Sequence, residues 1–220
     1  MTHISQDGDQ KTIQEYIARL TNVSRETQSG MSVLAALEIY AQLLVKWQAK
    51  INLVSRNSLN GLWTRHILDS AQLVPFLPVS PVKIMDIGSG AGFPGIILGI
   101  LTAHDVHLVE SDQRKCAFLR TVVRETGASA TIHNERIEAL ADMNPDIITA
   151  RALAPLDKLL ELTRQQHNEH LQFLFLKGKT AKQELTSLTS WPKLSAVLHP
   201  SITDSEAVLM QVISSFVPVD

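Results

Sequence analysis

One stretch near the middle of the chain combines a carboxylate with closely spaced glycines, a pattern that suits ligand binding. Val82–Ile87 has the length and apolar character of a strand, and Asp86 lies near its end. Gly88, Gly90 and Gly92 follow at alternate positions, and a proline then suits the first turn of a helix. Glycine lets the backbone approach a ligand that a Cβ would push away, and a helix N-terminus has free N–H groups. This strand–turn–helix unit therefore predicts a ligand site.

Two classes of ligand use such a turn. Dinucleotides use G-x-G-x-x-G, and residues Gly90–Gly95 fit that pattern. The sequence D-x-G-x-G-x-G, from Asp86 to Gly92, resembles the first motif of methyltransferases that use S-adenosylmethionine, where Asp86 would be a countercharge for the cofactor's ammonium group. The acid favours the methyltransferase over the dinucleotide enzyme, and a glycine-rich connection without a ligand is the third interpretation.

Composition limits the class of protein. The chain has 220 residues and a net charge of −2, which fits one domain of ordinary size and is not the profile of a dedicated nucleic-acid binder. The only cysteine, Cys116, cannot form an internal disulfide, and we expect no metal site. No secretory signal or membrane span is recognisable, so we expect a cytoplasmic protein. Between Glu38 and Asp69 the chain has no acidic residue, which predicts a positive face there unless its lysines and arginines are scattered over the surface.

The pattern of elements predicts the fold. Residues 1–80 form a helical N-terminal extension, with an N-cap at Ser32 and a third helix over about residues 58–73. Residues 81–220 form the core, in which the helix after the second strand ends at Gly127. Strands and helices alternate along the core, which predicts a mostly parallel sheet with helices on both faces. Two consecutive strands at the end predict an antiparallel hairpin. The seven expected strands are 82–87, 106–110, 130–133, 146–150, 171–176, 194–198 and 207–213.

Ligands in such sheets lie beyond the carboxyl ends of the strands, which directs attention to the residues there. Glu110 follows the second strand and can accept hydrogen bonds from two ribose hydroxyls, although an exposed strand-end acid is the alternative. After the third strand, Ile137 can pack on an adenine and Glu138 can lie near its amine, unless these residues form an ordinary charged turn. Arg151 ends the fourth strand and can bind a carboxylate or phosphate.

These pieces together resemble the family of ribosomal small-subunit RNA methyltransferase G. The resemblance rests on Asn52–Ser55, Arg65–Ser70, Asp86–Gly95, Arg136–Glu138, Arg151–Ala152 and Leu176–Gly178. It implies a class I methyltransferase with a Rossmann-like core that transfers a methyl group from S-adenosylmethionine to N7 of one guanine in the decoding-region loop of 16S ribosomal RNA. It places the cofactor on Gly88, Phe93, Ile137, Glu138 and Arg151. The glycine motif adds Asp86 and Gly90, and the end of the second strand adds Glu110.

The expected chemistry agrees with the residues. Guanine N7 has a free lone pair and needs no general base, so catalysis can be mostly positioning, with Arg151 the best candidate for a catalytic role. The alternative substrate is another RNA or a small molecule. The alternative function is that of a non-catalytic RNA-binding module. We expect a monomer that acts on 16S ribosomal RNA or the small subunit. The side chains expected to contact RNA are Arg65, His66, Arg136, Lys177 and Lys179.

Overall fold

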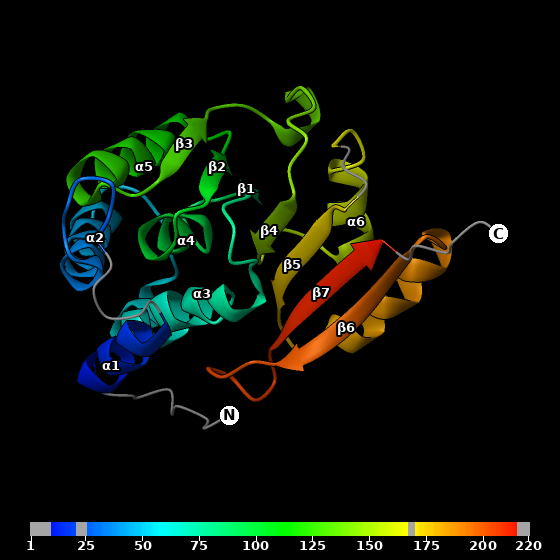
Figure 1. Ribbon diagram of the computed structural model, residues 1–220, viewed down its shortest axis with the longest axis horizontal. Helices are drawn as coiled ribbons and strands as arrows, with labels where there is room; N and C mark the ends of the chain where they lie inside the picture. Colours follow the sequence, from blue (N-terminus) through cyan, green and yellow to red (C-terminus); the bar gives the residue numbers. More distant parts are fainter. Residues whose placement is uncertain (1–9, 21–25, 167–169, 215–220) are drawn as a thin grey trace.

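A seven-stranded sheet forms the centre of the computed structural model, which describes residues 10–20, 26–166 and 170–214 (Figure 1). Its strand order is β3-β2-β1-β4-β5-β7-β6; β7 is antiparallel to both β5 and β6, and the other neighbours are parallel. The strands are β1 (Lys83–Ile87), β2 (Asp105–Val109), β3 (Ala130–His133), β4 (Ile147–Arg151), β5 (Gln172–Lys177), β6 (Leu194–Pro200) and β7 (Val208–Ser214). This confirms the predicted mixed sheet and its terminal hairpin.

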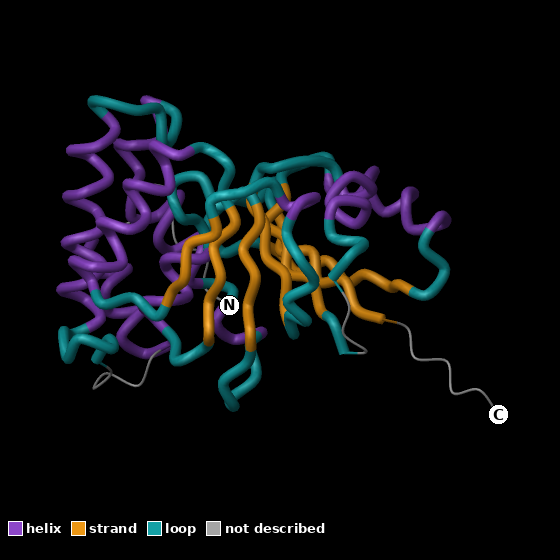
Figure 2. The backbone as a smooth tube through the Cα atoms, turned by 90° about the horizontal axis from the view of Figure 1, so that it is seen from above, coloured by secondary structure: helices purple, strands orange, loops and turns teal. Residues whose placement is uncertain are grey.

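Helices cover both faces of the sheet (Figures 1 and 2). They are α1 (Gln10–Leu20), α2 (Val33–Gln48), α3 (Asp69–Ala71), α4 (Gly95–Leu101), α5 (Gln113–Thr126), α6 (Leu156–Leu162) and α7 (Ala181–Glu184). Shorter turns of other pitch are η1 (Arg56–Gly61), η2 (Trp63–Leu68), η3 (Val74–Phe76), η4 (Ile137–Ala139) and η5 (Leu185–Ser190). None of the helices in the described ranges is long and apolar enough to cross a membrane.

The two sides of the sheet bury separate apolar clusters because side chains alternate along each strand. Ile84 and Leu108 pack with the helices that precede and follow β1, whereas Met85 and Phe175 pack with α6 and α7. Residues of the N-terminal helices, such as Tyr40, belong to the same cluster as Ile84. The division into residues 1–80 and 81–220 stays a prediction, and the packing makes the extension one wall of the core.

Local signals fix the helix ends where they were expected. The Ser32 hydroxyl accepts the N–H of Ala35 at the start of α2, 3.3 Å away. Gly127 ends α5 with φ +64, a left-handed conformation that glycine adopts without strain. Both ends depend on neighbouring residues in the chain, so the sequence pattern was sufficient to predict them.

The third helix differs from the regular one expected over residues 58–73. It is a continuous but irregular segment in which the 3-10 turn η1 leads into η2, a stretch of π-helix, and then into α3. Within it, the Ser70 hydroxyl donates to the carbonyl of His66 at 2.7 Å. A π-helical stretch often accompanies a functional site, and this one carries Arg65 and His66.

Candidate cofactor and substrate site

The glycine turn between β1 and α4 lies at the carboxyl edge of the sheet, where the strand order reverses. Gly88, Gly90 and Gly92 have φ values of +62, +57 and +96. A Cβ at Gly88 would overlap Leu153 and one at Gly92 would overlap Ile96, whereas one at Gly90 would meet nothing closer than 3.7 Å. The turn is therefore closely packed at its two ends and open at Gly90, which suits a ligand that approaches the backbone.

Glu110, directly after β2, fixes the open part of this turn. Its Oε2 accepts the N–H of Gly90 at 2.9 Å, and its Oε1 accepts the N–H of Asp112 at 2.8 Å. Each carboxylate oxygen has more than one acceptor position, so Glu110 can hold the turn and still accept a ligand hydroxyl. Its place at the site agrees with the predicted ribose contact, which stays a prediction.

Asp86 lies differently from what the motif suggested. Its side chain is fully buried, Oδ1 accepts the hydroxyl of Thr149 at 2.8 Å, and Oδ2 has no hydrogen-bond partner among the described residues. Burial raises the pKa of Asp86 to about 6, although the nearby charge of Arg151 favours the carboxylate. The enclosed carboxylate ties β1 to β4 beneath the turn, and its expected role as a countercharge for the cofactor's ammonium group stays a prediction.

Arg151 links the glycine turn to the N-terminal segment. Its guanidinium lies 4.5 Å from the centre of the Phe93 ring. Nη1 donates to the carbonyl of Arg65 at 3.1 Å and lies 3.4 Å from Oδ2 of Asp69. Asp69 in turn accepts the hydroxyl of Thr203 at 2.9 Å. The arginine expected at the end of the fourth strand is thus present at the site and held by groups 82 and 86 residues away.

His66 packs against the same aromatic ring. Its imidazole stacks on Phe93 with the ring centres 4.8 Å apart and the planes 18° apart. Neither ring nitrogen has a hydrogen-bond partner in the described part of the chain. Burial, together with the charges of Arg151 and Arg65, lowers the pKa of His66 to about 3. At neutral pH the imidazole is therefore uncharged, with one donor and one acceptor unused.

The segment after β3 borders the same edge. Ile137 is buried at the start of η4, while Arg136 and Glu138 are exposed on either side of it. Asn134 donates to the carbonyls of Glu110 and Ser111, both at 3.2 Å, which fixes this segment against the end of β2. The arrangement agrees with an adenine packed on Ile137, and that role stays a prediction.

The two lysines after β5 do not behave alike. Lys179 is exposed, as expected of an RNA-binding side chain. Lys177 is buried, and its ammonium donates to the carbonyl of Ala154 at 2.7 Å and to Glu184 at 2.8 Å. Although burial favours the neutral acid, hydrogen bonds from Lys177 and Thr180 hold the pKa of Glu184 below its ordinary value. We correct the expectation for Lys177, since an enclosed ion pair positions the loops beyond β4 and β5 and has no ammonium to offer RNA.

Several residues that shape the site were missed from sequence. The Tyr40 hydroxyl donates to the carbonyl of Ala91 at 2.7 Å, so α2 of the N-terminal extension holds the glycine turn. Leu153 covers Gly88, and the residue before it, Ala152, has φ +51. A positive φ at a residue with a side chain is uncommon and often accompanies functional sites. Only Asp69 had a signal that could have been used, because it belongs to the R-H-I-L-D-S block.

The fold and the site together define a class of protein. A sheet of order 3-2-1-4-5-7-6 with an antiparallel β7, and an open glycine turn after β1, is the arrangement of class I methyltransferases that use S-adenosylmethionine. The crystal structure of ribosomal protein L11 methylase from Lactobacillus delbrueckii subsp. bulgaricus shares the fold, with a TM-score of 0.59 and 16% identity over 69% of this chain and 79% of that one. This is the fold that the methyltransferase interpretation predicted, rather than that of the dinucleotide enzyme.

The sequence comparisons give the family. The model for rRNA small subunit methyltransferase G matches residues 33–211. Ribosomal RNA small subunit methyltransferase G of Paramagnetospirillum magneticum is 50% identical over 186 residues, which cover 84% of this chain and 91% of that protein. The protein of the same name from Parvibaculum lavamentivorans is 47% identical over 217 residues, 96% of this chain and 93% of that protein. The chain belongs to the rRNA small subunit methyltransferase G family.

Proposed function

We propose that this chain transfers a methyl group from S-adenosylmethionine to N7 of a guanine in the decoding-region loop of 16S ribosomal RNA. One observation carries the proposal: Phe93 on the glycine turn contacts both His66 and Arg151. The family's two more specific sequence blocks, Arg65–Ser70 and Gly92–Gly95, therefore meet beside Arg151, the last residue of β4. A site of this composition can hold a cofactor on one side and a base on the other.

The cofactor is held by the residues at the strand ends. The open backbone at Gly90 receives it, Glu110 accepts the ribose hydroxyls, and Ile137 and Glu138 contact the adenine. Asp86 supports the turn from beneath. Gly88, Phe93 and Arg151 are the remaining residues that we assign to the cofactor site. When bound, S-adenosylmethionine supplies an electrophilic methyl group on a positively charged sulfur.

The side chains of the site position the base without removing a proton from it. The N7 atom of guanine carries a lone pair that attacks directly, so no general base is needed. His66 is uncharged and stacks on Phe93, so it adds no positive charge that would oppose the methyl transfer. Asp69 compensates the charge of Arg151, so the site does not oppose the positive charge that moves from sulfur to guanine.

RNA outside the target base meets exposed cations around the opening. Arg65, Arg136 and Lys179 are exposed, and Lys177 drops out of this set because it is enclosed. Such contacts to phosphates make binding depend on salt concentration. The partner is 16S ribosomal RNA or the small subunit, and we assign the protein to the cytoplasm as a monomer; sedimentation at micromolar concentration tests the last point.

The decisive experiment maps methylated guanines in 16S ribosomal RNA by mass spectrometry in a strain that lacks this gene. We expect one N7-methylguanine to disappear and to return with the wild-type gene, but not with Glu110→Ala, which removes the carboxylate from the cofactor site. If every N7-methylguanine persists in the deletion strain, the target is another RNA or a small molecule. In that case the alternative substrate classes replace this proposal.

A further inference from the structure

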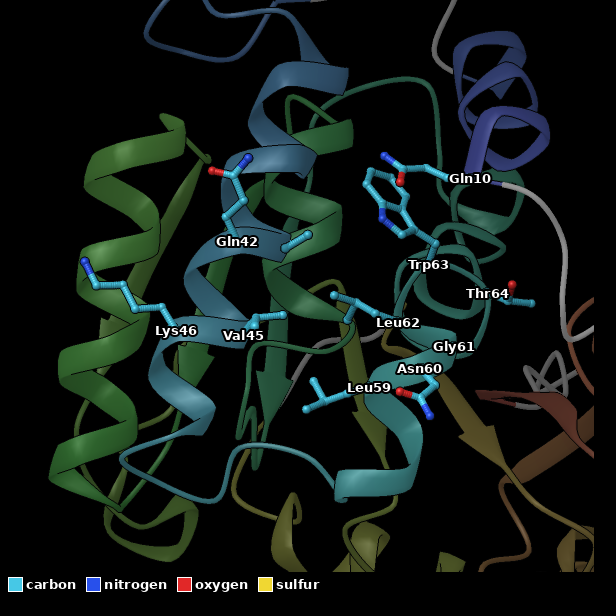
Figure 3. Close-up of a pocket in the computed structure, with 11 residues that line it drawn as sticks. Gln10, Gln42, Val45, Lys46, Leu59, Asn60, Gly61, Leu62, Trp63 and Thr64 are labelled. Carbon is cyan, nitrogen blue, oxygen red and sulfur yellow. The ribbon is translucent and has the colours of Figure 1, made fainter.

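A hollow of about 720 Å³ lies on the side of η2 that faces α2, separate from the glycine turn (Figure 3). Apolar groups line part of it, among them Trp63, which is half-buried, and Val45, which is 55% exposed. Gln10, Gln42 and Asn60 add three amide groups, and Lys46 adds a positive charge. Of the described residues that line the hollow, none is acidic.

This composition matches an unpaired nucleobase. A base has two apolar faces that stack on aromatic rings, and edges that both donate and accept hydrogen bonds. Amide side chains also donate and accept, so they pair with base edges without introducing a charge. The lining of the hollow is therefore complementary to a nucleotide, since it offers an indole, three amides and a lysine. It contains no carboxylate that would repel the phosphate.

The hollow continues into a basic surface along α2. Lys46 also lines a neighbouring hollow of about 600 Å³, together with Lys50 and Arg124. Lys50 then lines a third hollow with Arg114 and Lys115, at the start of α5. The acids on this surface are neutralised locally, since Glu125 pairs with Arg124 at 2.9 Å and Asp112 pairs with Arg114 at 3.4 Å. From the hollow toward the C-terminal end of α2, a phosphate backbone can therefore pass Lys46 and Lys50 without meeting an unpaired carboxylate.

The position of the hollow connects it with the methylation site. Trp63 and Thr64 line it, and the next residues of the same short helix are Arg65 and His66, of which His66 stacks on Phe93. The lining of the hollow and the contact with Phe93 thus come from four consecutive residues of η2, Trp63 to His66. An RNA strand with its target base at Phe93 can place a nearby unpaired base against Trp63.

We propose that this hollow binds a second, unpaired nucleobase of the RNA substrate, with Lys46 and Lys50 contacting the phosphates beside it. The inference rests on the proposed function for the identity of the RNA. It adds a base-binding site outside the cofactor site and a role for the acid-free stretch between Glu38 and Asp69. A second anchor of this kind allows the enzyme to recognise the shape of a loop as well as one guanine.

The test introduces a carboxylate at the edge of the hollow with Val45→Glu. Retention of naked 16S ribosomal RNA on filters and the KM for RNA in methylation assays are measured together. We expect the RNA Kd and KM to rise about tenfold because a carboxylate repels phosphate and disfavours the base, while kcat and S-adenosylhomocysteine affinity stay unchanged. The matched control is Val197→Glu on β6, where the valine is 48% exposed, and which should leave RNA binding unchanged.

A second pair of variants tests stacking itself. Trp63→Phe retains a flat ring and should keep most of the RNA affinity, whereas Trp63→Ala should lose it; urea unfolding identifies any loss of folding in the alanine variant. Naked-RNA affinity of Val45→Glu within twofold of wild type overturns the proposal. So does an effect seen only with assembled subunits, which would indicate that the hollow contacts a ribosomal protein. Failure of the proposed function is distinct, since the wild type would then bind RNA without methylating it.

Discussion

Replacing Gly90 with alanine tests separately how this glycine affects the stability of the fold and the binding of the cofactor. In the folded protein, alanine at φ +57 costs about 1–2 kcal/mol. Alanine also reduces the conformational entropy of the unfolded chain, which offsets about 0.4–1 kcal/mol of this cost. The new methyl group meets nothing closer than the Gly88 carbonyl oxygen at 3.7 Å, so no collision is added. We expect the free energy of unfolding to fall by roughly 1 kcal/mol, which leaves the protein folded.

Cofactor binding should respond far more strongly to the same change. The methyl group projects into the open space that we assign to S-adenosylmethionine, so the Kd for S-adenosylhomocysteine should rise at least about tenfold. Titration calorimetry gives the Kd, and urea unfolding gives the stability. The matched control is Gly30→Ala, in the turn before α2: its φ is +77 and its nearest atom lies 3.8 Å away, so it carries similar strain without facing the site. Equal Kd values for the two variants would refute the placement of the cofactor.

Three further perturbations test the surroundings of the site. Tyr40→Phe keeps the ring but leaves the Ala91 carbonyl without its hydrogen-bond donor. Urea unfolding should show that the free energy of unfolding falls by about 1–3 kcal/mol. An unchanged midpoint would mean that this hydrogen bond does not hold the turn. Asp69→Asn leaves the charge of Arg151 uncompensated, and the kcat for methylation should fall while far-ultraviolet circular dichroism stays unchanged. Because the pKa of His66 is about 3 in the folded state against about 6.5 unfolded, the unfolded chain binds more protons between these values. Wild type should therefore lose stability relative to His66→Leu as the pH falls from 6.5 toward 4, by up to about 1.4 kcal/mol per pH unit, and parallel pH curves would contradict this.

Much of the site could be predicted from sequence because its parts are local to the chain. The glycine spacing, the cap at Ser32 and the end of α5 at Gly127 follow from backbone preferences of a few adjacent residues. The carboxyl ends of parallel strands meet at one edge, so strand positions alone brought Glu110 and Arg151 to the site. The position of the third helix was predicted, but its irregular 3-10 and π-helical turns were not. These turns depend on packing that the sequence pattern does not reveal.

Tertiary contacts decided which charged groups face the ligand. Lys177 was predicted to contact RNA and Asp86 the cofactor, yet both side chains are buried, with Lys177 bonded to Glu184 and Asp86 to Thr149. The sequence by itself determined the fold, the glycine turn and the family, because these depend on local pattern and on short motifs. Only the structure decided burial and pairing, from the enclosed Lys177 to the contact of Arg151 with Asp69, because the dielectric environment and partners of a charge come from segments far away in the chain.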